Sequence, residues 1–302
     1  MSTILCFGEI LWDCLPHGLF LGGAPFNVAY HLKQLGHEPL MLSALGNDWL
    51  GAQTLKRIRA RALSDRLIHI DDTLPTGTVD AELDSSGNAT YTFADPAAWD
   101  RLPDTAALHE TSQQSIALVF GSLALRHEEN RKVLRKLLAQ KHGLRVFDVN
   151  LRQPYINIPL ILELAQQTDV LKLNASELLR LTDHAPVNEA DANEPLIQAQ
   201  LAVLQTKVPC RNICITRGEH GALWFHDGRT ISATAPPVTV RDTIGSGDAF
   251  TATLVSGLLS SATLAEPQKL LADACALGAF VASQDGPQPS YKPEMVFANT
   301  TK

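Results

Sequence analysis

A carboxylate follows a glycine-rich bend in the stretch DTIGSGDAF, which runs from Asp242 to Phe250. An apolar segment with helical spacing comes next, and a helix N-terminus presents unpaired backbone N–H groups and a partial positive charge. Phosphate can approach the backbone of Gly245, Ser246 and Gly247 closely, because two of these residues have no side chain. A carboxylate here would repel phosphate unless it takes a proton from an attacking hydroxyl. We therefore predict an anion hole in this bend and a general base at Asp248; a capped structural turn is the alternative.

A second stretch, LGGAPFNVAYHLKQLG, offers groups that suit a polyol. Gly22 and Gly23 permit a close backbone approach, and Asn27 presents a donor and an acceptor from the first turn of an expected helix. A plain packing turn would use the same residues. Neither stretch is the usual phosphate loop or a dinucleotide fingerprint, because the chain has no GK[ST] and Phe250 stands where a third glycine would be.

These stretches must be positioned by a larger framework. Apolar runs alternate with segments of helical period along the chain, which indicates an α/β fold with a mostly parallel sheet covered on both faces. Residues 25–36 are expected to form a helix, with Pro25 in its first turn and Gly36 at its C-terminal cap. Residues 76–93 alternate apolar and polar side chains around a Ser-Ser-Gly-Asn turn and predict an antiparallel hairpin. With a strand near residues 11–21, this hairpin would form a small flap.

Composition limits the partners and the compartment. Twenty-five Lys and Arg against 32 Asp and Glu give a net charge of −7 over 302 residues, so we expect binding neither to nucleic acid nor to a membrane. Without a basic region before an apolar stretch, and without a membrane-spanning run, a soluble cytoplasmic protein is expected. The five cysteines are scattered, which favours buried free thiols over disulfides or zinc. Residues 186–195 are expected to form a surface loop.

GGAPFN and DTIGSGDAF, in this order and at this wide separation, resemble the two signatures of the ribokinase-like, or phosphofructokinase-B-type, sugar kinases. The resemblance covers essentially the whole chain. It implies one kinase domain over residues 1–302, built as a three-layer αβα sandwich with a β-flap lid whose strands lie near residues 11–21 and 76–94. It also implies ATP as the phosphoryl donor and a magnesium ion.

The same resemblance gives roles to individual residues. Asp248 matches the catalytic base, and the backbone of residues 245–247 matches the anion hole. The residues that fall on sugar-binding positions are Asp13, Gly22, Gly23 and Asn27. Asn174 and Glu177 match an NxxE motif that organises Mg²⁺ and phosphate through water, although an Asn cap with a first-turn Glu explains the pair equally well.

Further positions would contact the nucleotide or a monovalent cation. The residues that would border ATP are Thr216, Gly218, Gly221 and Cys275. Cys275 departs from the family, because many members carry Asn there. The residues that match a K⁺ site in relatives are Asp242, Ile244, Ser283, Gly286 and Ser290, and a plain turn uses the same residues.

The sugar is suggested by GEILWD, YTFADPAAWD and FDVNLRQPY, which look most like bacterial fructokinases. This implies phosphorylation of the terminal hydroxyl of fructose to give fructose 6-phosphate. Arg152 lies in a DxNxR pattern shared with 2-keto-3-deoxygluconate kinases, and it would bind a ketose or the carboxylate of an acid sugar. Stabilisation of its own loop through Asp148 is the alternative. Tyr91 and Phe93 would cover the sugar or pack across strands.

Other readings stay open beside a fructokinase. Another sugar or nucleoside kinase of the same family would carry the same signatures. A sugar or nucleotide sensor on this fold would be expected to lose Asp248, so the presence of Asp248 favours catalysis. A nucleoside hydrolase or a nucleic-acid binder is disfavoured, because the chain lacks a carboxylate cluster for metal and a basic stripe. A homodimer through the flap is expected, since a flap with one apolar face is stabilised by pairing with its copy.

Overall fold

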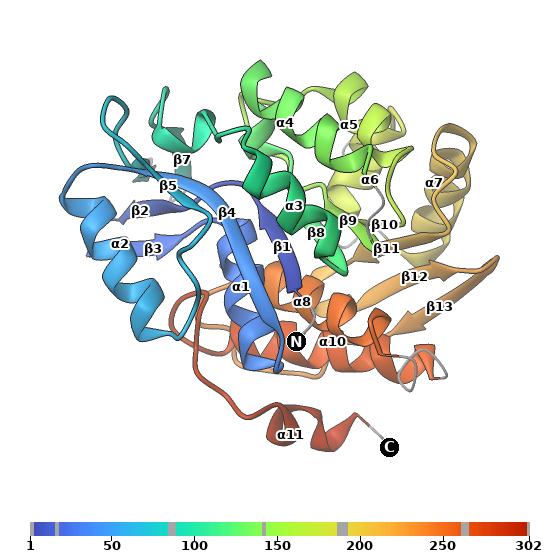
Figure 1. Cartoon of the computed structure of the whole chain (residues 1–302). Coiled ribbons are helices and arrows are strands. Elements are labelled where there is room, and N and C mark those ends of the chain that lie inside the picture. Colours follow the sequence, from blue (N-terminus) through green and yellow to red (C-terminus); the bar gives the residue numbers. More distant parts are fainter. Residues whose placement is uncertain are drawn as a thin grey trace. The chain divides into compact units, whose positions relative to one another are not determined.

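The computed structural model describes residues 3–15, 18–83, 89–140, 143–185, 193–260 and 266–300. Internal contacts divide the chain into unit 1, residues 1–118 and 123–142, and unit 2, residues 119–122 and 143–302. The described strands form one nine-stranded sheet in the order β13-β12-β11-β10-β9-β8-β1-β4-β5 and one four-stranded sheet in the order β3-β2-β6-β7 (Figure 1). This mostly parallel sheet with flanking helices confirms the predicted α/β class.

Unit 1 combines strands of both sheets with helices. Its strands are β1 (Thr3–Phe7), β2 (Leu11–Leu15), β3 (Gly18–Gly22), β4 (Glu38–Gly46), β5 (Ile68–Asp71), β6 (Gly77–Leu83) and β7 (Ala89–Phe93). Its helices are α1 (Ala24–Gln34), α2 (Trp49–Ala60), α3 (Ala106–Gln114) and α4 (Glu128–Leu138), with 3-10 turns η1 (Ala98–Asp100) and η2 (Leu123–Leu125). Helix α1 confirms the helix expected over residues 25–36, with Pro25 in its first turn and Gly36 at φ 87° beyond its end.

The small sheet belongs to unit 1. Strands β6 and β7 pair antiparallel, which confirms the hairpin expected over residues 76–93. The single strand expected near residues 11–21 is wrong, because β2 and β3 are two strands that pair antiparallel. Strand β2 ends at Leu15, immediately before Pro16, and a proline has no N–H with which to continue a ladder. Parallel pairing of β2 with β6 joins the two hairpins into one sheet.

Unit 2 carries most of the predicted phosphate-binding residues. Strand β8 (Ala117–Phe120) passes from unit 1 into unit 2 after Leu118, and the other strands are β9 (Leu144–Asp148), β10 (Val170–Asn174), β11 (Asn212–Thr216), β12 (Ala222–His226) and β13 (Arg229–Ala233). The helices are α5 (Ile158–Ala165), α6 (Ala175–Leu181), α7 (Glu194–Lys207), α8 (Ser246–Leu258), α10 (Pro267–Ala282) and α11 (Pro293–Val296), with 3-10 turns η4 (Gly218–His220) and η5 (Phe297–Asn299). Of the surface loop expected at 186–195, residues 186–192 lie outside the described part of the chain.

The core of unit 2 follows from its sequence pattern. Strands β9, β10 and β11 pair in parallel, so both of their faces are covered and their sequences read as apolar runs. Helices α8 and α10 pack against each other (Figure 1). All five cysteines are free thiols, as predicted, and four of them are buried.

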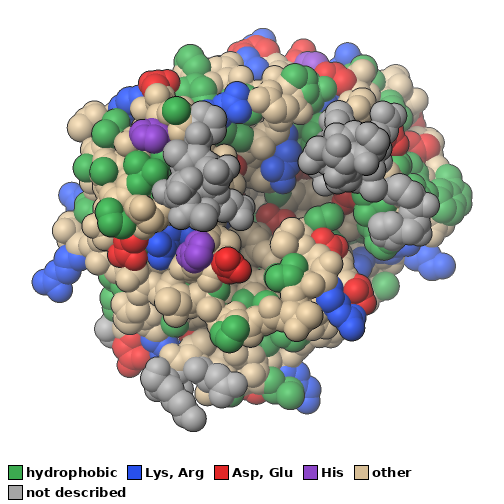
Figure 2. Space-filling view, turned by 180° about the vertical axis from the view of Figure 1, so that it is seen from behind, with side chains coloured by type: hydrophobic (Ala, Val, Ile, Leu, Met, Phe, Trp, Pro, Cys, Tyr) green, Lys and Arg blue, Asp and Glu red, His purple; other side chains and the backbone are tan. Residues whose placement is uncertain are grey.

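The surface mixes charges of both signs. On the face drawn in Figure 2, Lys and Arg side chains lie interspersed with Asp and Glu side chains, and hydrophobic side chains lie between them. Local electrostatics on this face are therefore set by individual groups. No helix in the described ranges is long and apolar enough to cross a membrane.

Candidate active site

The glycine-rich bend forms the start of α8. Gly245 is the N-cap residue in the left-handed region at φ 82°, and a Cβ there would lie 2.5 Å from Pro287 Cβ, so glycine is required. Within the described residues, no side chain caps α8, whereas the side chain of Asn174 caps α6. The first turn of α8 is partly exposed, and the N–H of Ser246 donates to Thr243 O at 3.3 Å, so an anion site in this bend would rely chiefly on the N–H groups of Gly245 and Gly247.

Asp248 is the third residue of α8 and is partly exposed. It interacts electrostatically with Lys172 of β10, whose side chain is only 8% exposed. A Cβ on Gly247 would lie 3.0 Å from Lys172 Nζ, so the ammonium group stands directly beside the bend. The start of α8 therefore combines uncapped N–H groups, a buried cation and a carboxylate.

The charge of Lys172 is maintained by its neighbours. Burial alone would lower the pKa of the ammonium group, but the carboxylates of Asp148, Glu177 and Asp248 raise that pKa above its usual value. Nζ donates a hydrogen bond of 3.0 Å to Asp148 Oδ1. The neighbouring carboxylates therefore favour the charged form of Lys172.

Asn174 and Glu177 form a capping box at the start of α6. Asn174 Oδ1 accepts from the N–H of Glu177 and Glu177 Oε2 accepts from the N–H of Asn174, both at 2.8 Å, while Glu177 Oε1 accepts from the N–H of Leu151 at 2.8 Å. Burial raises the pKa of Glu177, and the Lys172 ammonium opposes that rise. The local capping role anticipated from the sequence is thus present. Each oxygen keeps a further lone pair, so water-mediated contact with a cation remains chemically available.

The residues predicted to border the nucleotide lie at and beyond the ends of β10 and β11. Thr216 pairs in register with Asn174, at the carboxyl ends of neighbouring parallel strands. Gly218 and Gly221 have φ values of 54° and 82°, and a Cβ on Gly221 would lie 2.0 Å from Ala233 O. Cys275 is different, because it is 5% exposed and packs against Ala233, and burial raises its pKa to about 12.

The residues predicted to hold K⁺ lie on two adjoining segments. Asp242 Oδ1 accepts from the N–H of Ile244 at 2.9 Å, and the N–H of Asp242 donates to Ala282 O at 3.3 Å. Ser283 follows Ala282 at the C-terminal cap of α10. Gly286 has φ 77°, whereas Ser290 is exposed.

The residues predicted to bind sugar gather at the start of α1 in unit 1. A Cβ on Gly22 would lie 2.6 Å from Asp13 Oδ2, so the carboxylate lies over that glycine. Gly23 is the N-cap of α1 at φ 109°, and its carbonyl accepts from the N–H of the buried Asn27 at 2.9 Å. These four residues are therefore close together.

The remaining residues predicted to bind sugar differ in location and in exposure. Phe93 of β7 pairs with Val79 and is half-buried. The backbone of Tyr91 pairs with Ala81, and its side chain lies outside the described part of the structure. Arg152 is exposed and its Nη1 donates to Leu151 O at 3.1 Å.

The alternative role of Arg152, in which it stabilises its loop through Asp148, is wrong. Asp148 accepts instead from Lys172 and from Thr251 Oγ1, the latter at 2.7 Å. Sequence reasoning missed both of these donors. Lys172 carried a signal, because it is the one charged residue inside the apolar run VLKLN. The sequence gives no comparable signal for Thr251, since a single threonine in a helix is common.

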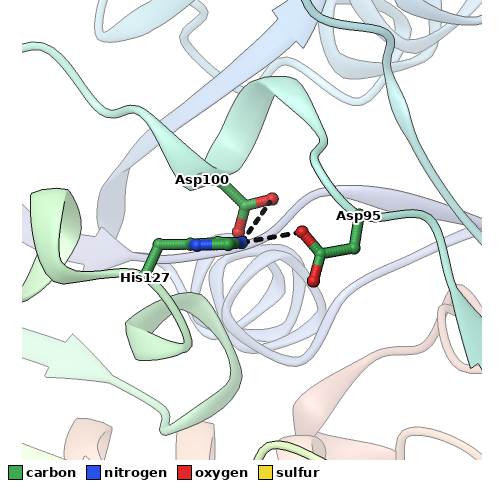
Figure 3. Close-up of side chains that lie close together, drawn as sticks. All are labelled: Asp95, Asp100 and His127. Carbon is green, nitrogen blue, oxygen red and sulfur yellow. Dashed lines mark hydrogen bonds and ion pairs between the residues drawn. The ribbon is translucent and has the colours of Figure 1, made fainter.

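A second cluster of titratable groups lies in unit 1 (Figure 3). His127 Nε2 lies 2.8 Å from Asp95 Oδ1 and 3.8 Å from Asp100 Oδ2. Asp100 also accepts from Arg126 Nε at 2.8 Å and from Arg126 Nη2 at 2.6 Å. The guanidinium group already neutralises the buried carboxylate, so this cluster is a structural ion pair with a histidine at its edge.

The chain is similar to known proteins in sequence and in fold. A fructokinase from Rhizobium leguminosarum bv. trifolii is 28% identical over 302 residues, covering 95% of this chain and 87% of the relative. A fructokinase from Xylella fastidiosa with bound ATP superimposes with a TM-score of 0.81 at 21% identity, covering 99% of each chain. Aminoimidazole riboside kinase from Salmonella enterica, complexed with aminoimidazole riboside and an ATP analogue, gives 0.80 at 22% identity, covering 99% of this chain and 100% of that one. At these identities the two structures establish the fold.

The family is established by the sequence itself. The profile of the pfkB family carbohydrate kinases matches residues 17–295, which include both glycine-rich stretches. The predicted enzyme class, an ATP-dependent carbohydrate kinase, is thereby confirmed. The chain belongs to the pfkB family of carbohydrate kinases.

Proposed function

We propose that this protein transfers the γ-phosphoryl group of ATP to the terminal hydroxyl of fructose, giving fructose 6-phosphate and ADP. The observation that carries the proposal is the start of α8. Asp248 follows Ser246 and Gly247 in a first turn that no described side chain caps, and the buried ammonium group of Lys172 lies beside Gly247. The fructokinase relative at 28% identity supports the choice of sugar.

The chemistry needs one proton acceptor and a stabilised anion. Asp248 takes the proton of the sugar hydroxyl as its oxygen forms a bond to the γ-phosphorus, and the bond from that phosphorus to the bridging oxygen breaks to release ADP. The N–H groups of Gly245, Ser246 and Gly247 stabilise the charge on the transferring oxygens. Because these donors are fixed by the helix, they need little reorganisation during the reaction.

We assign the partners of this reaction as follows. Thr216, Gly218, Gly221 and Cys275 border the nucleotide, with Cys275 contributing through packing because it is buried. Asn174 and Glu177 suit Mg²⁺, since their oxygens are hard ligands with free lone pairs. Bound Mg²⁺ supplies neutralisation of the ATP phosphates. The K⁺ site is assigned to Asp242, Ile244, Ser283, Gly286 and Ser290, whose two segments adjoin.

Sugar binding is assigned to unit 1. Asp13 and Asn27 present a carboxylate and an amide for hydroxyl groups, and Gly22 and Gly23 keep the backbone accessible. Tyr91 and Phe93 belong to the small sheet, which we assign as the lid of a single kinase domain. Arg152 is assigned to the sugar or to its phosphate product.

A coupled ADP-release assay over ketoses, acid sugars and nucleosides tests the substrate. Fructose is expected to give the highest kcat/KM. Turnover confined to nucleosides, or absent with every compound, would contradict the proposal.

The same assay examines 2-keto-3-deoxygluconate as a second candidate. Arg152 favours this acid sugar, because its only hydrogen bond within the described ranges is to the carbonyl of Leu151 and a carboxylate would suit the guanidinium group. If the acid sugar is the substrate, Arg152→Lys is expected to raise its KM by about 10-fold, since bidentate pairing is lost.

A homodimer through the small sheet is also part of the proposal. Leu19 and Phe20 of β3 are 43% and 37% exposed, and β3 is an edge of that sheet. Pairing with a second copy would cover these apolar side chains. Light scattering should give twice the chain mass, and Leu19→Lys should give the monomer mass.

A further inference from the structure

Three side chains from separate elements meet behind the first turn of α8. Asp148 ends β9, Lys172 lies in β10 and Thr251 lies in α8. Lys172 and Asp148 are direct register partners in parallel strands, so their side chains lie on the same face of the sheet. Asp148 is 5% exposed, Lys172 is 7% exposed and Thr251 is fully buried.

Both carboxylate oxygens of Asp148 accept hydrogen bonds. Oδ1 accepts from Lys172 Nζ at 3.0 Å and Oδ2 accepts from Thr251 Oγ1 at 2.7 Å. Thr251 Oγ1 also lies 2.9 Å from Gly247 O, the carbonyl of the first turn. A hydroxyl has one proton, so Thr251 donates to one of these two acceptors at a time, and the shorter contact, to Asp148 Oδ2, ties α8 to the end of β9 one helical turn after Gly247.

The Lys172 ammonium completes this connection from the other side. It has three N–H donors, and within the described residues its one hydrogen bond goes to Asp148. The other donors remain beside Gly247, where a Cβ would lie 3.0 Å from Nζ. Without the Asp148 contact, a flexible lysine side chain would have several rotamers and no fixed position there.

We propose that Asp148 is a positioning residue for phosphoryl transfer, which fixes the first turn of α8 through Thr251 and fixes the Lys172 ammonium beside Gly247. The inference rests on the proposed kinase reaction at α8. It gives the Asp of the DxNxR pattern a role apart from the sugar. Asp148 acts through other groups and touches no reacting atom itself.

Titratable groups on four elements interact with Lys172. They are Asp148 of β9, Glu177 of α6 and Asp248 of α8, with the thiol of Cys214 on β11 as its register partner. Three carboxylates interact with this one cation, so the position of the ammonium group decides which of them it attracts most strongly. Asp148, through its direct bond, holds the cation at the sheet.

The test compares Thr251→Val with Thr251→Ser. Valine keeps the shape but removes the hydroxyl, whereas serine keeps the hydroxyl. Thr251→Val is expected to lower kcat by about 10-fold with the sugar KM within about 2-fold, because one hydrogen bond to a charged group is lost. Thr251→Ser should stay within about 2-fold of the unaltered protein.

Rates are measured well below the melting temperature and expressed per folded molecule. A structural role would lower the melting temperature without lowering that rate. Equal kcat in the valine and serine variants would overturn the proposal. Asp148→Asn is the second variant. A kcat for this variant within about 2-fold of the unaltered protein would also overturn the proposal.

Hydrogen exchange over residues 243–255 gives a readout that needs no turnover. The valine variant should exchange faster than the serine variant by about 10-fold in the first turn of α8, since its anchoring bond is lost. Equal exchange in both variants overturns the inference. Absence of kinase activity in the unaltered protein overturns the proposed function alone, so the two failures are distinguishable.

Discussion

Each unit contains a buried ion pair, and the two pairs are built differently. In unit 1, Asp100 accepts two hydrogen bonds from Arg126, which also donates to Ala94 O and lies over the Trp99 ring at 4.1 Å from its centroid. In unit 2, Asp148 accepts a single bond from Lys172. Arg126 thus contacts three partners, whereas Lys172 Nζ has one hydrogen bond within the described residues and lies beside the glycine bend.

This difference fits a structural role for the pair in unit 1 and the proposed reaction role for the pair in unit 2. A guanidinium with a bidentate carboxylate and a stacked indole is held in one geometry. An ammonium group is a compact point charge with three rotatable N–H donors, and it suits reversible binding of an anion. In the account proposed here, the pair in unit 1 stabilises the fold and the pair in unit 2 places a cation where phosphate would bind.

The largest effect is expected from Arg126→Met. Removal of one partner leaves Asp100 buried without its cation, which should lower the free energy of unfolding by about 3–5 kcal/mol. Denaturant unfolding measures the loss. Arg126→Lys keeps the charge but loses the bidentate bond, so its free energy of unfolding should lie between those of the unaltered protein and Arg126→Met. A loss below about 1 kcal/mol for Arg126→Met would mean that this pair is not structural.

Lys172→Met should act mainly on the reaction. We expect kcat to fall on the order of 10²-fold, because a preorganised cation beside the phosphoryl group is lost. Steady-state rates with saturating sugar and ATP measure this effect.

The double variant Asp148→Asn with Lys172→Met is the control for folding. Removing both charges should recover most of the stability that either single change costs, but none of the turnover. Full recovery of kcat would assign the unit 2 pair to structure alone.

Gly247→Ala should give a smaller effect. The added Cβ would lie 3.0 Å from Lys172 Nζ, so the ammonium must shift by a few tenths of an ångström. We expect kcat to fall by about 10-fold, because catalysis depends steeply on position. Gly228→Ala lies in the turn between β12 and β13 with open space around it and φ 81°, so it should cost some stability through backbone strain but leave kcat per folded molecule unchanged. Equal effects of the two changes would argue against a role for the ammonium position.

Much of the framework was predictable because its causes are local. Buried parallel strands read as continuous apolar runs, and Pro25 and Gly36 mark the ends of α1. The bend before α8 was recognisable for the same reason, since two glycines and a carboxylate are adjacent in the chain. Local signals also mark the capping box of Asn174 and Glu177.

The network behind α8 was not predictable, because it is assembled by sheet register and helix packing. Asp148 is 24 residues from Lys172 and 103 residues from Thr251. Its nearest charged neighbour in the sequence pattern, Arg152, makes its hydrogen bond to Leu151 O instead. The break between β2 and β3 differs from the single strand expected near residues 11–21, although Pro16 is a local signal for it.

The most direct test of the central assignment is the turnover of Asp248→Asn with the best sugar from the substrate panel. The amide keeps the size of the side chain but takes up no proton, so kcat should fall on the order of 10²-fold or more with the sugar KM nearly unchanged. Turnover close to that of the unaltered protein would remove Asp248 from the mechanism.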